Sequence, residues 1–174
     1  MQTDHFDSFV EEFVEEKIER SLIILGTAKI DNQLLLILTK HLLPPKNAKE
    51  DDLLNGDNPI SNFSSRIKLV HRLGIIDDSL AEVLNQVRKV RNKCAHALNI
   101  KNNSFNDSIS DLRKRFVGRQ SFEWTKNRYF AYGLESKLEE LQCVFIAIFV
   151  VLEAILENII KTSGVEATLK ISTK

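Results

Sequence analysis

Hydrophobic residues recur with the 3.6-residue period of an α-helix along most of the chain. The segments that show this period are 6–14, 22–42, 61–73, 78–97, 107–116 and 134–162. Residues 117–133 lack it, and we expect an irregular stretch there with room for a small extended element or hairpin. The pattern therefore predicts an all-α fold, a single-domain bundle of about five to six helices.

Polar and turn residues separate these segments at defined positions. Pro44 and Pro45 end the long second segment, because proline cannot continue a helix. Ser61 or Asn62 is placed to cap the third segment, and Gly74 to close it. Asp77 or Asp78 is placed to cap the fourth. At 174 residues the chain suits one domain, predicted over 1–163, followed by a flexible tail over 164–174.

The composition excludes several classes of protein. Apolar residues make up 43% of the chain, and 24 basic side chains balance 24 acidic ones, so it is not a strongly basic nucleic-acid binder. The two cysteines and four histidines show no metal-ligand spacing, which predicts no metal and no cofactor. The first twenty residues lack an apolar signal region, and the apolar run Cys143–Leu152 is too short to span a bilayer. We expect a cytoplasmic protein without a membrane segment.

The end of the 78–97 helix carries the side chains of most chemical interest. At 100° per residue, one apolar stripe forms there, made of Val83, Val87, Val90, Cys94 and Ala97. Asn85, Arg88, Asn92 and His96 fall on the opposite face. Arg91 lies on the flank, about 140° from His96 in a regular helix. A second copy of the chain in a dimer, or a distortion at the helix end, could bring these two side chains together.

Two interpretations of this polar face stay open. Arg91 can hold a phosphate, His96 can move protons near neutral pH and Asn92 can orient either one, which is the set that metal-independent RNA cleavage needs. A helix that buries a valine stripe also carries charged and amide residues on its wet face as a matter of course. From residues 91–96 alone we favour the solvated face, and the catalytic interpretation depends on the wider sequence context.

Residues 113–132 interleave cations with aromatic rings. The candidate nucleic-acid contacts in and near this region are Arg88, Arg113, Arg115, Arg119, Trp124 and Arg128. Cations bind phosphate and aromatic faces stack unpaired bases. The alternative is that the aromatic rings anchor a loop to the core while the cations keep it soluble, and for Trp124 we favour the buried anchor.

Three segments in order resemble one known family. They read NPISNFSSRI over 58–67, LGIID over 73–77 and VRKVRNKCAH over 87–96. Together they resemble the bacterial mannitol operon repressor (MtlR-like) family, and the likeness extends over about residues 15–116. The Arg91-Asn92-x-x-x-His96 element is also similar to the signature of the wider HEPN superfamily of small helical domains.

The resemblance implies more than the residues alone do. It implies an HEPN-like bundle that dimerises through the motif helices, and metal-independent endoribonuclease activity in many superfamily members. In that case Arg91 would hold the scissile phosphate, His96 would move protons during attack by the ribose 2′-OH, and Asn92 would orient them. Members close to the mannitol repressor are instead transcriptional regulators.

Three functions are therefore kept open. The first is a regulatory protein that acts in transcription control through a protein partner or nucleic acid. The second is a metal-independent ribonuclease, a toxin or defence effector, with Arg91, Asn92 and His96 in a dimer cleft. The third is a non-catalytic helical dimerisation module. The separation of Arg91 and His96 and the very apolar 138–159 segment predict a homodimer, and RNA, DNA or a protein remain its candidate partners.

Overall fold

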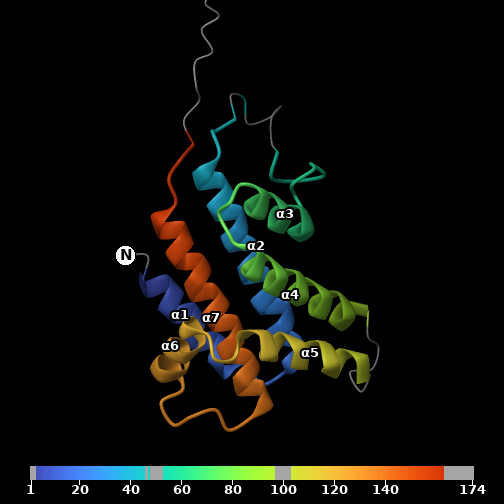
Figure 1. Ribbon diagram of the computed structural model, residues 1–174, viewed down its shortest axis with the longest axis vertical. Coiled ribbons are helices and arrows are strands. Elements are labelled where there is room, and N and C mark those ends of the chain that lie inside the picture. The colour runs from blue at the N-terminus through green and yellow to red at the C-terminus, as the bar shows by residue number, and fades with distance from the viewer. Residues whose placement is uncertain (1–2, 46, 48–52, 97–102, 163–174) are drawn as a thin grey trace, which may run out of the picture.

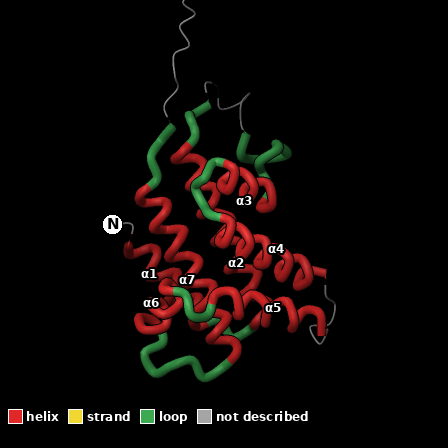
Figure 2. Tube along the Cα trace, viewed as in Figure 1, coloured by secondary structure: helices red, strands yellow, loops and turns green. Residues whose placement is uncertain are grey.

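The computed structural model describes residues 3–45, 47, 53–96 and 103–162. Within them the chain forms seven α-helices and no strand, which confirms the all-α bundle (Figures 1 and 2). The helices are α1 (Thr3–Glu15), α2 (Glu19–His41), α3 (Phe63–Arg72), α4 (Asp78–His96), α5 (Asn103–Phe116), α6 (Gln120–Tyr129) and α7 (Lys137–Asn158). The tail predicted for 164–174 lies outside the described residues.

The expectation of an irregular segment over 117–133 is wrong, because α6 lies there and raises the helix number to seven. This helix has only ten residues, and it buries just Phe122 and Thr125 within its length. A stripe of two residues is too short to stand out as a helical period. The α6 backbone is held instead by its packing against α7.

The last helix is shorter than the predicted 134–162. It begins after Ser136, whose side chain accepts a hydrogen bond from the Glu139 amide, while the Glu139 carboxylate accepts from the Ser136 amide. This reciprocal capping box satisfies amides that the first turn of a helix leaves without partners. Its C-terminal cap is Ile159.

Helices α2 and α7 pack along each other and form the centre of the bundle (Figure 1). On one side α1 and α6 pack against α7, and on the other α3 and α4 pack against α2. Helix α5 bridges α4 and α7. The two central helices accordingly supply much of the core, including nine consecutive buried residues from Leu141 to Phe149.

Helix α2 is apolar on nearly all sides. Its inner face is fully buried, yet Ile24, Leu25 and Leu36 are each exposed by 44–47%. Among the described residues it is the one helix whose length and composition would allow it to cross a membrane, and half of its most apolar window is buried inside the bundle. Burial on that scale is what the core helix of a bundle requires, so its composition alone is weak evidence for a membrane.

Several residues predicted to begin or end helices stand at the observed helix boundaries. Asn62 caps α3 by accepting a hydrogen bond from the Ser65 amide at 2.9 Å. Asp77 does the same for α4, where its carboxylate accepts from the Leu80 amide at 2.7 Å. Gly74 follows α3 with a φ of 69°, a left-handed conformation that favours glycine.

Candidate functional site

The apolar stripe of α4 is buried as expected. Val83, Val87, Val90 and Cys94 are each exposed by 1% or less, while the last member of the predicted stripe, Ala97, lies outside the described residues. Burying this stripe against α2, α3 and α5 turns the opposite face of α4 toward solvent. The candidate polar residues are thus held on a well-packed helix.

Three of these polar residues line one open cavity of about 490 Å³. Arg88, Arg91 and Asn92 come from α4, Asp31 from α2, and Asn62 and Ser64 from the N-terminal end of α3. The cavity, which we call the α4 cavity, lies where these three helices meet. Sequence reasoning missed Asp31, Asn62 and Ser64, since no local pattern ties them to α4.

The α4 cavity has a positive character. Arg91 is exposed and its Nη1 donates to Asn92 Oδ1 at 3.3 Å, so the amide orients the guanidinium. Arg88 is half-buried, and its Nε is buried without a hydrogen-bond partner among the described residues. The carboxylate of Asp31 is neutralised by Arg66 at 2.8 Å. Two guanidinium groups beside the N-terminus of a helix suit a carboxylate or phosphate group.

The third member of the proposed catalytic set is His96, the last residue of α4, and its side chain lies outside the described residues. The structure therefore brings together Arg91 and Asn92, and their relation to His96 stays a prediction. No group of three or more His, Cys, Asp and Glu residues that could hold a metal ion occurs in the described part of the chain.

The cations of the 113–132 region are dispersed, and four of them, Arg113, Arg115, Arg119 and Arg128, have structural partners. Arg113 donates to the Lys137 carbonyl at 2.9 Å and lies 3.8 Å from the Glu140 carboxylate, with 14% of its side chain exposed. It joins α5 to the start of α7. Burial and a carboxylate neighbour leave this guanidinium little capacity to bind an external phosphate.

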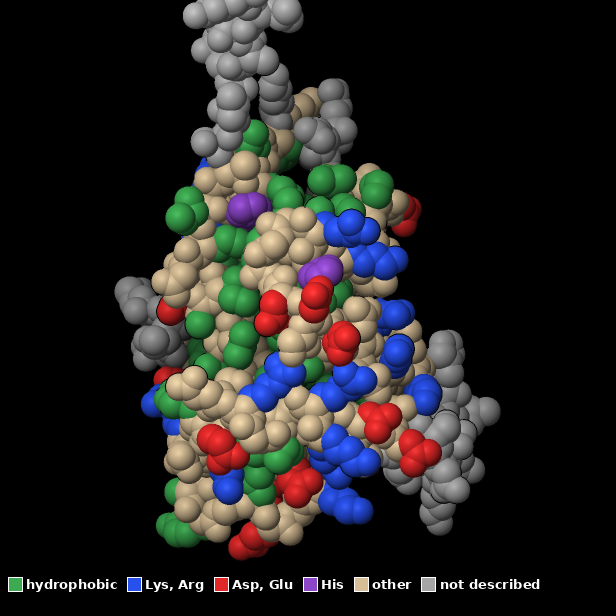
Figure 3. Space-filling model, viewed as in Figure 1, with side chains coloured by type: hydrophobic (Ala, Val, Ile, Leu, Met, Phe, Trp, Pro, Cys, Tyr) green, Lys and Arg blue, Asp and Glu red, His purple; other side chains and the backbone are tan. Residues whose placement is uncertain are grey.

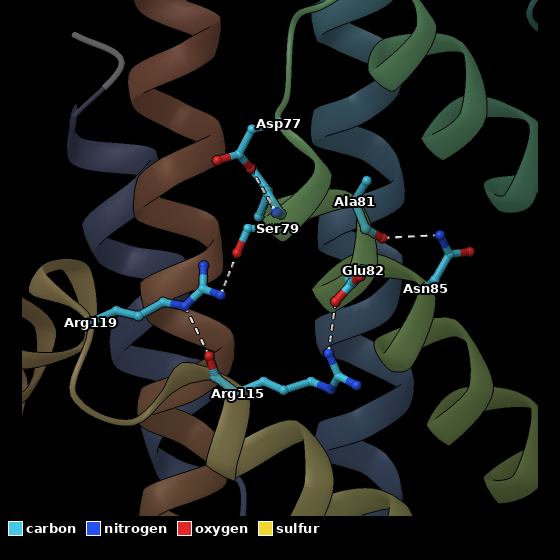
Figure 4. A network of polar contacts seen from close by, with 8 residues as sticks. Asp77, Ser79, Ala81, Glu82, Asn85, Arg115 and Arg119 are labelled. Atoms are coloured by element: carbon cyan, nitrogen blue, oxygen red, sulfur yellow. Dashed lines mark hydrogen bonds and ion pairs between the residues drawn. The ribbon is translucent and has the colours of Figure 1, made fainter.

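Arg115 and Arg119 hold the end of α5 against the first turns of α4 (Figure 4). Arg115 Nη1 lies 2.8 Å from Glu82 Oε2. Arg119 Nη2 donates to Ser79 Oγ at 2.7 Å, and its Nε donates to the Arg115 carbonyl at 2.9 Å. These contacts fix the loop between α5 and α6.

Trp124 and Arg128 lie apart from that group, on α6 facing α1 and α7. Trp124 is 47% exposed, so it is presented at the surface and is not the buried anchor that we favoured. The Arg128 guanidinium lies 5.5 Å from the Trp124 ring centroid and 3.5 Å from Asp7. The six candidate nucleic-acid residues thus belong to four separate sets of contacts on the molecule.

The environment of neither cysteine favours the thiolate form that a nucleophile requires. Burial raises the pKa of Cys143 to about 12, with a smaller raising effect from Glu123. Burial also raises the pKa of Cys94, although the nearby Arg20 and Arg91 oppose the shift. Both thiols stay protonated near neutral pH and act as core side chains.

Basic side chains gather on one face of the bundle (Figure 3). Residues 83–106 contain no Asp or Glu. The exposed cations on α3 and α4 are Lys68, Arg72, Lys89, Arg91 and Lys93. Although the net charge of the chain is zero, the molecule has a basic surface over α3 and α4, which includes Arg91 of the α4 cavity.

Comparison with known proteins gives a likeness of fold. No protein-family model and no curated protein sequence matches the chain. Among solved structures it resembles a chain in the X-ray structure of the MtlR–HPr complex from Escherichia coli, with a TM-score of 0.56 and 19% sequence identity. The match covers 87% of this chain and 97% of that one. At such low identity it shows a shared helical fold.

Proposed function

We propose that this protein is a regulatory protein of the mannitol-repressor type that acts by binding a protein partner. The observation that carries the proposal is the fold likeness to a protein whose structure was solved in complex with HPr, which extends over 97% of that chain. Two of the three segments that resemble the mannitol-repressor family, 58–67 and 87–96, line the α4 cavity in this structure. An HPr-like protein is accordingly the first partner to test.

The distribution of charge favours a protein partner over direct reading of DNA. Arg113, Arg115 and Arg119 are engaged by side chains and carbonyls of the bundle itself. The exposed cations over α3 and α4 are five in number, and the net charge of the molecule is zero. Proteins that recognise double-stranded DNA by its sequence usually have a strongly basic face and a recognition helix whose side chains contact the bases.

Isothermal titration calorimetry with purified HPr from Escherichia coli, and with the HPr-like protein of the source organism, tests this proposal. We expect saturable binding that weakens about five- to tenfold in Arg91→Ala, the size of effect expected for one well-placed arginine at an interface. Lys114→Ala removes an exposed cation from α5 and serves as the matched control. No binding by a correctly folded protein would contradict the proposal.

A second candidate function is the metal-independent ribonuclease. The observation in its favour is that Arg91 and Asn92 contact each other at a cavity that Arg88 also lines. In this proposal the ribose 2′-oxygen attacks phosphorus and the 5′-oxygen leaves. Arg91 would neutralise the phosphate, and His96 would exchange the protons of the attacking and leaving oxygens. A second copy of the chain would supply the groups that one copy does not bring together.

A further inference from the structure

A second cavity, of about 300 Å³, opens between α1, α6 and α7 on the side of α7 away from α4. We call it the α6 cavity. Its floor is apolar, formed by Val150 and Ala154 of α7. Its walls combine aromatic rings with charged groups, chiefly Phe6, Asp7, Trp124, Arg128, Glu153 and Glu157.

The aromatic rings of this cavity are already arranged to receive a cation. Trp124 and Tyr129 meet edge to face, with centroids 6.3 Å apart and planes at 75°. The guanidinium of Arg128 lies over both rings, 5.5 Å from the Trp124 centroid and 5.3 Å from that of Tyr129. Ring faces carry negative potential and attract cations at such distances. Half of the Arg128 side chain is exposed, so the mouth of the cavity stays open beside it.

The charges around the cavity do not balance. Asp7 is matched by Arg128 at 3.5 Å and accepts a hydrogen bond from the Tyr129 hydroxyl at 3.0 Å. Glu153 and Glu157 take part in none of the ion pairs found in the described part of the chain. The buried Gln33 side chain donates to Glu153 Oε2 at 2.9 Å and so fixes one of these carboxylates. Three carboxylates and one guanidinium line the cavity, and the Lys29 ammonium lies 5.7 Å from the centroid of the Phe6 ring, so the carboxylates outnumber the nearby cations by one.

We infer that the α6 cavity is a docking site for a lysine or arginine side chain of a partner polypeptide. The excess negative charge attracts a cation and repels phosphate. The apolar floor suits the methylene stem of a long basic side chain, whose charged end would then lie between Trp124 and the Glu153 and Glu157 carboxylates. Because this surface is separate from the α4 cavity, the inference stands or falls independently of HPr binding.

Trp124 is the single tryptophan of the chain, so its fluorescence reports on this cavity alone. We would titrate the full-length protein with the peptide acetyl-Ala-Lys-Ala-Arg-Ala-amide at low ionic strength. Its acidic counterpart, acetyl-Ala-Glu-Ala-Glu-Ala-amide, is the control probe. We expect a saturable change in Trp124 emission with the basic peptide, weakened by salt because exposed charges are screened, and no change with the acidic one.

Removing a carboxylate and removing the resident cation test the assigned chemistry in opposite directions. Glu157→Gln, alone and with Glu153→Gln, should weaken binding of the basic peptide by about three- to tenfold. Arg128→Gln removes the resident cation, and binding should tighten, whereas a site for anions would be weakened by the same change. Asp111→Asn with Glu135→Gln changes the charge by the same amount as the double variant at two exposed residues outside the cavity.

The response to the two peptides and its change in the variants decide whether the α6 cavity binds a basic side chain. A saturable, salt-sensitive response to the basic peptide that weakens in Glu157→Gln but not in the Asp111/Glu135 control supports the inference. An equal response to both peptides, a response unaffected by either glutamate, or preferential binding of the acidic peptide overturns it. Circular dichroism of each variant shows that the fold is unchanged.

Discussion

The Arg66 guanidinium lies 2.8 Å from the Asp31 carboxylate, with 8% of the arginine side chain and 31% of the aspartate side chain exposed. Arg66 Nη2 also donates to the Leu54 carbonyl at 2.9 Å. One side chain thereby joins α3, α2 and the loop before α3. It also neutralises the only carboxylate that lines the α4 cavity among the described residues.

Arg66→Ala should therefore lower the free energy of unfolding by about 2–3 kcal/mol, because it removes the ion pair with Asp31 and the hydrogen bond to the Leu54 carbonyl. This loss of stability is smaller than that expected when a fully buried ion pair is broken, because the Asp31 side chain keeps contact with water. Urea denaturation followed by circular dichroism measures it. Arg72→Ala, an exposed arginine of the same helix, should change stability by at most about 0.5 kcal/mol.

Gly26 allows α2 and α7 to approach closely. A methyl group at this position would lie 2.5 Å from Phe145 Cδ1 and 2.8 Å from Cε1. Gly26→Ala should destabilise the protein by about 1–3 kcal/mol through overpacking, which outweighs the roughly 0.5–1 kcal/mol that alanine gains over glycine in a helix.

A double-mutant cycle with Phe145→Leu tests the cause of this effect. The smaller side chain should make room for the methyl group, so that the double variant is more stable than the sum of the two single changes predicts. Additive effects would show that the steric conflict lies elsewhere.

The capping box of α7 should contribute a pH-dependent part of the stability. The Glu135 amide, at 2.7 Å, is the main cause that lowers the pKa of Glu139, and the Ser136 amide and hydroxyl add to it. A pKa lowered by folding means stability that is present above the ordinary glutamate pKa of about 4.3 and is lost as the pH falls through the lower folded value.

Glu139→Gln keeps a hydrogen-bond acceptor but removes this titration. The free energy of unfolding of the variant should consequently fall less steeply with decreasing pH in the acidic range than that of the wild type. Parallel curves for the two proteins would contradict the assignment.

The two thiols should be unreactive in the folded protein. With the pKa of Cys143 raised to about 12 and that of Cys94 also raised, the thiolate form is scarce at about pH 8, and both side chains are buried. A chromogenic disulfide reagent should label neither cysteine until denaturant is added, and then both. Rapid labelling of the native protein would mean that the α4 or α7 core opens easily.

If the protein is a ribonuclease, His96→Ala should reduce RNA cleavage by about 10²–10⁴-fold, the range for loss of a general acid or base. Arg91→Ala should weaken both phosphate binding and turnover. Lys89→Ala, an exposed cation of the same helix, should leave cleavage nearly unchanged. Activity should persist in EDTA. A requirement for Mg²⁺, or cleavage that survives both substitutions, would refute the mechanism and leave the regulatory proposal standing.

Local patterns in the sequence determined most of the secondary structure. The valine stripe of α4 is buried as its spacing predicts, and Asn62 and Gly74 stand at the two ends of α3. Pro44 and Pro45 follow the end of α2 closely. These features depend on backbone geometry and on side chains at most a few turns apart, so they can be predicted from neighbouring residues alone.

Tertiary packing decided the position of α6, the composition of the two cavities and the pairing of the charged side chains. The period of α6 is too weak to see because Phe122 and Thr125 are its only buried residues, and α7 supplies the surface that they cover. Packing likewise brought Asp31 and Asn62 to Arg91, and Glu153 to Trp124, pairs that lie in different helices and at no fixed spacing along the chain. The cations of 113–132 read as one cluster in sequence, yet Arg113 faces Glu140 and Arg128 faces Asp7. Which charges are neutralised and which stay available depends on how the helices pack, and no pattern along a single helix contains that information.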